Sequence, residues 1–196
     1  ALQSALLAEL PFALTGSQRD AIEDIKADMQ APSRMLRLLQ GDVGSGKTVV
    51  AVLAMLQAVA NGTQAAIMAP TEILAQQHGE TIGPWLDALG LRWAMITGRN
   101  KGKLRQARLD DLASGETQIA IGTHALFQDD IVFKDLGLAV VDEQHRFGVH
   151  QRMSLSSKGN GVDVLVMTAT PIPRTLTLTA YGDMDVSRMP DKPPGR

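Results

Sequence analysis

The eight residues GDVGSGKT, at positions 41–48, constrain the fold more than any other stretch of the sequence. They match the pattern G-x-x-x-x-G-K-[ST] at every fixed position. An apolar segment (34–40) that predicts a strand precedes them, and an alanine-rich segment (47–60) that predicts a helix follows. The glycines let the backbone curl until its N–H groups point inward, and the new helix aims its positive end at the same place. The stretch therefore predicts a phosphate-binding loop between a strand and a helix.

Two side chains of this loop have chemistry that a purely structural turn does not need. Lys47 is placed to reach the β- and γ-phosphates of a nucleotide, and the Thr48 hydroxyl is placed to bind Mg²⁺. The alternative is a glycine turn whose lysine only faces water. Because glycine averages about 7% of residues, the full pattern seldom arises by chance. The predicted nucleotide contacts in the loop are Gly41, Asp42, Gly44, Ser45, Gly46, Lys47 and Thr48.

The rest of the chain alternates between strand-like and helix-like segments. Residues 17–30 predict a helix, because Ser17 and Asp20 have capping-box spacing and apolar residues then recur at helical intervals. Runs that are apolar on both faces predict further strands near 65–70, 92–97, 118–123, 137–143 and 162–168. Such strands, separated by helical patterns, predict the α/β class: a doubly wound, mostly parallel sheet with helices on both faces.

Two carboxylates follow one of these strands, where a buried strand would avoid them. Leu138 to Val141 are apolar, and Asp142 and Glu143 come next. Unpaired charges are costly out of water, so the pair needs a reason such as a metal. A phosphate-bound Mg²⁺ needs a carboxylate from a neighbouring strand tip, which predicts Asp142 as the metal ligand. Glu143 is then the group that orients or deprotonates the attacking water. A solvated strand end is the alternative, which the phosphate-binding loop disfavours.

Composition limits the location and the partners of the chain. It has 196 residues, of which 44% are hydrophobic, no cysteine, and a net charge of -2. The lack of cysteine excludes disulfides and zinc–thiolate sites and fits a reducing cytoplasm. No apolar run approaches the roughly 18 residues of a membrane helix, which predicts a soluble protein. With so little net charge, any contact with nucleic acid must be local. The four histidines, His78, His124, His145 and His150, show no metal-ligand spacing.

One local stretch, residues 99–108, is strongly basic. It contains five cationic residues and no acid, namely Arg99, Lys101, Lys103, Arg105 and Arg108. Binding of nucleic-acid phosphates is one interpretation. A solvated helix face is the other, because acidic residues follow closely at 110, 111 and 116 and no aromatic residue is interleaved.

Five strings occur in an order that resembles a known family. They are GDVGSGKT, APTEILAQQH, GTHALFQ, DEQHRFG and TATPIPRTL, and the match runs from about Phe12 to Arg196. Together they resemble the first motor lobe of superfamily 2 helicases, and most closely the RecG family of bacterial branched-DNA helicases. The transcription-repair coupling factors share several of these strings and remain the alternative, but DEQHRFG and LTAYGD favour RecG.

The resemblance implies a RecA-like lobe that binds Mg-ATP on one edge and DNA on another. Gln18, with Phe12 and Leu14 before it, resembles the motif that reads adenine through a side-chain amide, although Gln18 also suits an ordinary first-turn position. The family's DNA path corresponds to Pro70, Thr71, Glu72, Thr97, Gly98, Gly122, Thr123 and His124. Coupling between the nucleotide and the DNA corresponds to Gln144, His145, Thr168 and Thr170; a satisfied loop pair is the alternative for the first two.

The expected function belongs to a longer protein. It would remodel stalled replication forks and Holliday junctions by ATP-driven movement on duplex DNA, in the bacterial cytoplasm and associated with the nucleoid. We expect residues 1–15 to be a linker or helix from a preceding domain, 16–188 the ATP-binding lobe, and 189–196 the start of a linker to a second lobe. Wedge and second motor lobes would belong to the same polypeptide, so this chain alone would bind ATP weakly with little turnover. The rival classes are a small-molecule kinase and a non-catalytic DNA-binding scaffold.

Overall fold

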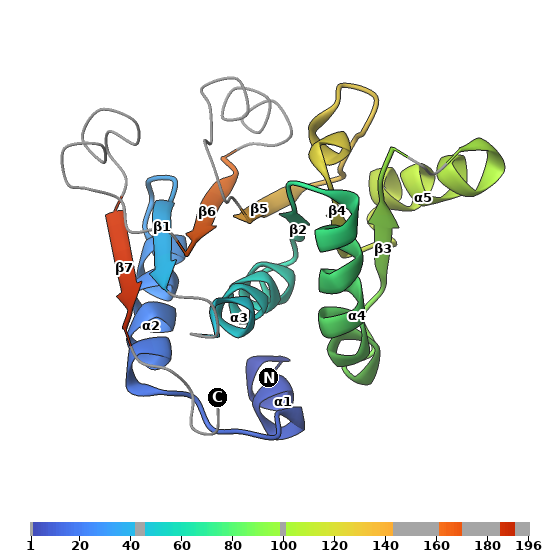
Figure 1. Ribbon diagram of the computed structural model, residues 1–196. Coiled ribbons are helices and arrows are strands. Elements are labelled where there is room, and N and C mark those ends of the chain that lie inside the picture. Colours follow the sequence, from blue (N-terminus) through green and yellow to red (C-terminus); the bar gives the residue numbers. More distant parts are fainter. Residues whose placement is uncertain (1, 42–45, 99–100, 143–160, 170–184, 191–196) are drawn as a thin grey trace.

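The computed structural model describes residues 2–41, 46–98, 101–142, 161–169 and 185–190 (Figure 1). Within these ranges, seven parallel strands form one sheet in the order β3-β4-β2-β5-β6-β1-β7. The strands are β1 (Leu36–Gly41), β2 (Gln64–Met68), β3 (Trp93–Ile96), β4 (Ile119–Gly122), β5 (Leu136–Asp142), β6 (Asp163–Thr168) and β7 (Asp185–Met189). The helices are α1 (Leu2–Glu9), α2 (Gly16–Gln30), α3 (Lys47–Ala60), α4 (Glu72–Ala88), α5 (Gly102–Ser114) and the short 3-10 helix η1 (His124–Phe127).

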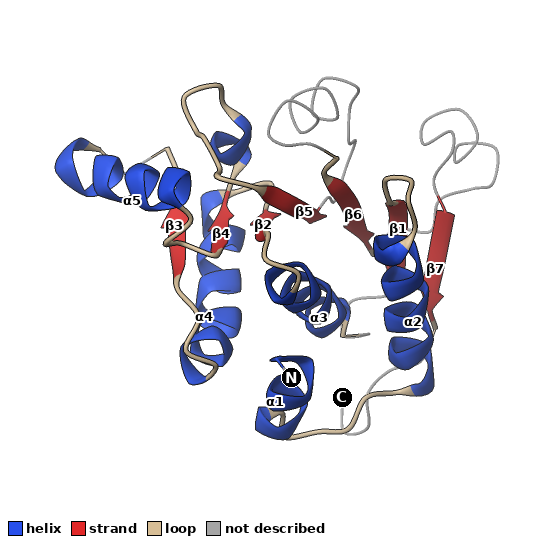
Figure 2. Ribbon diagram, turned by 180° about the vertical axis from the view of Figure 1, so that it is seen from behind, coloured by secondary structure: helices blue, strands red, loops and turns tan. Residues whose placement is uncertain are grey.

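Helices cover both faces of the sheet, so the predicted fold class is confirmed. Helices α1 to α4 enclose one apolar core with one face of the strands, while α5, η1 and the segment 128–135 enclose a second core on the other face. Figures 1 and 2 show α2 at the β7 end of the sheet, α5 at the β3 end and α1 beside α3. None of the described helices is both long enough and apolar enough to span a membrane.

The central elements are buried on all sides, which explains their sequences. Every residue of β2 and of β4 is buried, as a parallel sheet between two helical layers requires. Most of α3 is buried too, which explains its run of alanine, valine and leucine. The helix has the predicted bounds, and Gly62, just beyond its end, has the positive φ of 86° that ends many helices.

The capping box at the start of α2 lies elsewhere than predicted. The helix begins at Gly16, and the box is formed by Thr15 and Gln18 rather than by Ser17 and Asp20. The Thr15 hydroxyl accepts from the Gln18 backbone N–H at 3.2 Å, and the Gln18 side chain accepts from the Thr15 N–H at 2.8 Å. The prediction was wrong because two overlapping pairs have the same spacing, and the spacing does not decide between them.

Both ends of the described chain pack into the sheet and its helices. Leu6 of α1 is fully buried, and the Gln3 amide donates to the Leu53 carbonyl of α3 at 2.9 Å. At the other end, β7 was not predicted as a strand, and its last residue is Met189. The assignment of residues 1–15 to a preceding domain and of 189–196 to a linker stays a prediction, although α1 and β7 are packed parts of this lobe.

Arg37 of β1 fixes β7 and α2 to the sheet. Its Nε donates to Asp28 Oδ2 at 2.7 Å, and its Nη1 donates to the Ser187 hydroxyl at 2.9 Å. Burial lowers the Arg37 pKa, but the hydrogen bond and charge of Asp28, together with Asp24 and Asp185, outweigh it and raise the pKa. The guanidinium therefore stays charged and joins three elements that are distant in sequence.

Two glycines of α4 allow a tryptophan to pack against the helix backbone. A Cβ on Gly79 would lie 2.6 Å from the Met95 methyl, and one on Gly83 would lie 2.5 Å from the Trp93 ring. The indole cannot easily move, because its Nε1 donates to Asp87 Oδ1 at 2.9 Å. The close approach of α4 to β3 therefore requires glycine at both positions.

We predict that Gly83→Ala destabilises the chain by about 1–3 kcal/mol, because the clash with Trp93 exceeds the gain in helix propensity of about 1 kcal/mol. Gly16→Ala is the matched control, since a Cβ there would have no atom within 4 Å. Urea unfolding of both variants measures the difference. Equal stability of the two variants would show that the indole does not need the space.

A second prediction concerns Asp163, whose Oδ1 accepts from the Met35 N–H at 2.7 Å. Burial raises the pKa of this carboxyl above 3.8, with Asp28 acting in the same direction; the Met35 hydrogen bond and Arg34 oppose the rise. The folded state therefore binds the proton of the Asp163 carboxyl more tightly than the unfolded state does. The stabilisation from this proton is complete below the ordinary pKa and is lost as pH rises through the pKa of the folded state.

Asp163→Asn keeps an oxygen acceptor for Met35 without the charge. We expect its unfolding free energy to lack the decline that the wild type shows as pH rises from the ordinary pKa of aspartate through the raised pKa of Asp163. Asp129→Asn, on an exposed loop, controls for the change in net charge. Denaturant unfolding across pH 3.5 to 7.5 measures both; identical slopes for wild type and Asp163→Asn would refute the assignment.

Candidate nucleotide and DNA site

The carboxyl ends of the strands meet at one edge of the sheet. The pairing register places Ile96, Gly122, Met68 and Val141 level with one another, and Val141 continues through Val166 to Leu38 of β1. Ligands of open parallel sheets bind in crevices at this edge. Among the described residues, several predicted site residues lie at or just after these strand ends, so the fold brings them to one edge of the sheet: Gly41, Thr71, Thr97, Gly122, Asp142 and Thr168.

The two described ends of the glycine loop have features of an anion-binding site. Gly41 is the last residue of β1, and Gly46, with φ of 84°, directly precedes α3. Gly46 has no side chain to cap the helix. The start of a helix is a common position for a bound anion. The Lys47 ammonium donates to the Gly41 carbonyl and so lies across the loop, and Thr48 is half-buried beside it. Asp42, Gly44 and Ser45 lie outside the described residues.

Asp142 ends β5 at the same edge, but its strand is not the neighbour of β1. Strand β6 lies between them: Asp142 is level with Met167, and Met167 with Leu39. Two strand spacings separate Leu39 from Asp142, roughly 10 Å between Cα atoms. The sequence analysis expected Asp142 on a strand next to the one that leads into the glycine loop. The structure corrects this expectation, because β6 lies between β1 and β5. Glu143, Gln144 and His145 lie outside the described residues.

Asp142 has a partner that the sequence analysis missed. His78 of α4 donates from Nε2 to Asp142 Oδ2 at 2.7 Å, since an ionised carboxylate can only accept. The two side chains are 13% and 22% exposed. The residues are 64 positions apart, so no spacing in the sequence pairs them. Only the tertiary fold brings the two residues within hydrogen-bonding distance.

The residues at this edge suit Mg²⁺ better than a metal that several protein side chains must enclose. In the part of the chain that the structure describes, no three His, Asp or Glu side chains gather around one point. Mg²⁺ is typically held by one or two carboxylates, waters and phosphates rather than by a protein cage. Asp142 and the Thr48 hydroxyl are the described oxygen groups that the sequence analysis predicted for it.

Gln18 connects the start of α2 to the glycine loop. Its side chain is fully buried; Oε1 accepts from Thr15, and Nε2 donates to the Gly46 carbonyl at 3.2 Å. In this structure the amide bonds to the protein at both its oxygen and its nitrogen. Its reading of adenine therefore stays a prediction, and the ordinary helix-start position, which was the alternative, describes its contacts.

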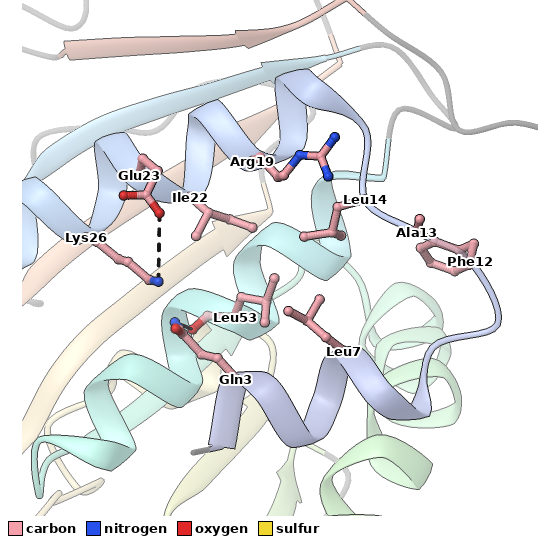
Figure 3. Close-up of a pocket in the computed structure, with 10 residues that line it drawn as sticks. All are labelled: Gln3, Leu7, Phe12, Ala13, Leu14, Arg19, Ile22, Glu23, Lys26 and Leu53. Atoms are coloured by element: carbon pink, nitrogen blue, oxygen red, sulfur yellow. Dashed lines mark hydrogen bonds and ion pairs between the residues drawn. The ribbon is translucent and has the colours of Figure 1, made fainter.

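Phe12 and Leu14, the other predicted adenine contacts, line a pocket of about 460 Å³ (Figure 3). The pocket lies between α1, α2, α3 and the segment that joins the first two helices, and Leu53 of α3 lies at its floor. Leu53 is seven residues from Gly46, roughly 10 Å along the helix. The pocket and the described end of the loop thus lie along the same helix, α3.

The predicted DNA contacts lie past β2, β3 and β4, on the other half of the same edge. Thr71 caps α4 by accepting from the Leu74 N–H at 3.2 Å, between half-buried Pro70 and Glu72. Thr123 caps η1, and exposed His124 follows it. The remaining predicted positions are buried Thr97, exposed Gly98 and buried Gly122.

Two predicted functional residues also have a structural reason to be there. A Cβ on Gly122 would overlap the Ile96 carbonyl, so glycine is needed for β3 and β4 to approach. Thr168 is buried at the end of β6, level with Gln40 of β1. Thr170 lies outside the described residues. The DNA and coupling roles of these residues stay predictions.

The basic stretch is partly committed to the fold. Arg105 pairs with Asp130 at 2.8 Å, and Arg108 donates to the Met95 carbonyl at 2.6 Å. Lys101 and Lys103 are exposed, and Arg99 lies outside the described residues. Arg105 and Arg108 therefore hold α5 in place, a role that neither interpretation predicted. The choice between phosphate binding and a solvated face stays open for the exposed lysines.

The sequence was also compared with known families and proteins. The family model for the DEAD/DEAH box helicase matches residues 15–179, most of the chain. The chain belongs to the DEAD/DEAH box helicase family. Membership implies that this DEAD/DEAH box lobe uses ATP. The ATP-dependent DNA helicase RecG of Pasteurella multocida is 52% identical over 199 aligned residues, covering 100% of this chain and 29% of that protein. RecG of Bacillus subtilis is 53% identical over 187, covering 95% and 27%.

Solved structures agree with the sequence relatives. The structure of RecG bound to a three-way DNA junction superposes with a TM-score of 0.81 at 41% identity, covering 98% of this chain and 26% of that one. The DUF1998 helicase MrfA bound to DNA and AMPPNP has a TM-score of 0.72 at 19% identity, covering 97% and 29%, which supports the fold alone. The RecA-like fold and the resemblance to the first motor lobe of RecG are confirmed. This DEAD/DEAH box lobe spans less than a third of the curated relatives' length.

We predict that Gln18→Glu and Gln18→Ala separate the two hydrogen bonds of this side chain. Both variants keep the Thr15 hydroxyl cap, which uses the backbone N–H of residue 18. Glutamate keeps the acceptor for the Thr15 N–H but replaces the donor to Gly46 with a buried carboxylate oxygen that the Gly46 carbonyl repels, so the loop loses its tether. Alanine loses both side-chain hydrogen bonds, each worth about 0.5–1.5 kcal/mol. Thermal unfolding and fluorescent-nucleotide titration measure the two effects. Wild-type nucleotide affinity in both variants would contradict a link between Gln18 and the loop.

Proposed function

We propose that this chain is the ATP-binding lobe of a DNA helicase that remodels branched DNA, such as stalled replication forks and Holliday junctions. The observation that carries the proposal is the common edge at which the glycine loop before α3 and the carboxylate of Asp142 both lie. The family match and the similarity to RecG proteins support it. Bacterial relatives support a cytoplasmic location; association with the nucleoid is part of the proposal.

In this proposal, the residues at the edge divide the work on ATP. The N–H groups of the first turn of α3 bind phosphate oxygens, and Lys47 moves from the Gly41 carbonyl to the β- and γ-phosphates. Thr48 and Asp142 would hold Mg²⁺, which would neutralise charge at the phosphates. Glu143 orients the attacking water, and Phe12 and Leu14 contact the base in the pocket of Figure 3.

DNA would follow the ends of β2, β3 and β4. A backbone N–H group at the start of α4 can bind a nucleic-acid phosphate, because helix starts have unpaired donors. Gln144, His145, Thr168 and Thr170 would connect the nucleotide to this path. The ability of the relative RecG to bind a three-way DNA junction supports branched DNA as the substrate.

Hydrolysis needs more than this lobe. Motors of this kind bring a positive side chain to the γ-phosphate from a second lobe, and its absence costs about 10³ to 10⁵ in rate in comparable enzymes. The RecG relatives are more than three times as long as the chain, which supports a second motor lobe and a wedge domain in the same polypeptide. A translocase lobe like that of the transcription-repair coupling factors is the alternative for the whole protein.

The decisive variant is Glu143→Gln in the full-length protein. We expect it to abolish DNA-stimulated ATP hydrolysis while ATP and branched-DNA binding remain nearly wild type, because only the water-activating group is changed. Steady-state ATPase assays and junction-binding titrations measure the two properties. A non-catalytic scaffold would show no ATPase in the wild type and no effect of the substitution.

A separate prediction concerns this chain without the rest of the protein. It should bind nucleotide, but its turnover should be at least about 10³-fold below that of the full-length protein, because the second lobe is missing. ATPase assays on both proteins at equal concentration test this. Robust DNA-stimulated hydrolysis by residues 1–196 alone would overturn the requirement for a second lobe.

A further inference from the structure

The hydrogen bond between His78 and Asp142 joins two parts of the proposed motor that the sequence does not connect. Asp142 is the proposed metal ligand at the end of β5, and His78 lies in the second turn of α4. The contact of 2.7 Å is short, and both side chains are mostly buried. Figure 1 shows α4 running beside β4 and β3, away from the strand that carries Asp142 in the sheet order.

Packing alone does not explain this pair. The residues of β5 before Asp142, from Leu138 to Val141, are all buried and apolar, and the inward face of α4 carries Ala75, Ile82 and Leu86. Burial of a polar pair gains little stability over an apolar pair of similar size, because both groups lose water. The contact therefore points to a function of the carboxylate that the imidazole serves.

We propose that His78 is a positioning residue that orients Asp142 toward the metal of the bound nucleotide, an inference that rests on the proposed function. The Nε2–H donates to Oδ2, which fixes the rotation of the carboxylate and leaves Oδ1 for the metal or for a metal-bound water. Carboxylates that ligate metals are usually held in this way by a second hydrogen bond, and loss of such a partner lowers metal affinity by about 10- to 100-fold.

The same contact connects Asp142 with the proposed DNA path. Thr71 caps α4, and His78 is seven residues further along the helix, roughly 10 Å. In this proposal, DNA bound at the first turn of α4 would act on Asp142 through the helix that carries His78.

Two amides separate the hydrogen bond from the size and polarity of the side chain. In His78→Gln the amide nitrogen takes the place of Nε2 and still donates to Asp142. In His78→Asn it takes the place of Nδ1 and falls short. His78→Leu removes the donor altogether, and Gln77→Leu, at an exposed position of the same helix, is the control.

The test uses the full-length protein with Mn²⁺ and a non-hydrolysable ATP analogue, followed by electron paramagnetic resonance. We expect His78→Leu and His78→Asn to raise the half-saturating Mn²⁺ concentration by about tenfold, the lower limit for such partners. His78→Gln and Gln77→Leu should stay within about twofold of wild type. The ratio of DNA-stimulated to basal ATPase should fall in the first two variants and recover in His78→Gln, with junction affinity unchanged.

Several outcomes overturn the inference. One is a His78→Asn variant that melts at a lower temperature but binds Mn²⁺ as the wild type does. The others are equal metal binding by His78→Gln and His78→Asn, and tighter metal binding by His78→Leu than by the wild type. Should His78→Leu not fold, the comparison of Gln with Asn decides. If the wild type shows no metal-dependent nucleotide binding, the proposed function is refuted as well. If the wild type binds metal and nucleotide normally and the His78 variants do the same, only the role of His78 is refuted.

Discussion

The register of the parallel sheet is the constraint on which the proposed site depends. Hydrogen bonds from β5 to β6 and from β6 to β1 place Asp142 level with Leu39, two residues before the end of the strand that leads into the glycine loop. A slip of one residue in either pairing would turn Asp142 to the opposite face of the sheet. Strands buried on both faces resist such a slip, because it would exchange residues between two closely packed apolar cores.

Polar contacts at the carboxyl edge connect the helices to this frame. Lys47 bonds to the end of its own strand, Gln18 joins α2 to the loop, and His78 joins α4 to β5. These contacts differ from the Arg37 network, which lies on β1 away from the loop and fastens β7. The edge thus contains polar side-chain contacts, whereas the body of the sheet is held by apolar packing.

Much of the fold was predictable, because the glycine loop and the apolar runs are local signals. The bounds of α3 and the parallel class followed from them. The capping box, β7 and the strand between β1 and β5 did not: the first had two equal solutions, β7 is held by the distant side chain of Arg37, and strand order is a property of tertiary packing. The His78–Asp142 contact joins residues 64 positions apart, and it has no local pattern.

The central claim is that Lys47 and Asp142 act on one Mg-nucleotide. A crystal structure of the chain with Mg²⁺ and a non-hydrolysable ATP analogue tests it most directly. The account predicts the triphosphate at the start of α3, Lys47 Nζ on the β- and γ-phosphates, and the metal bound to Asp142 directly or through one water. Phosphates bound away from Lys47, or a metal out of reach of Asp142, would contradict it.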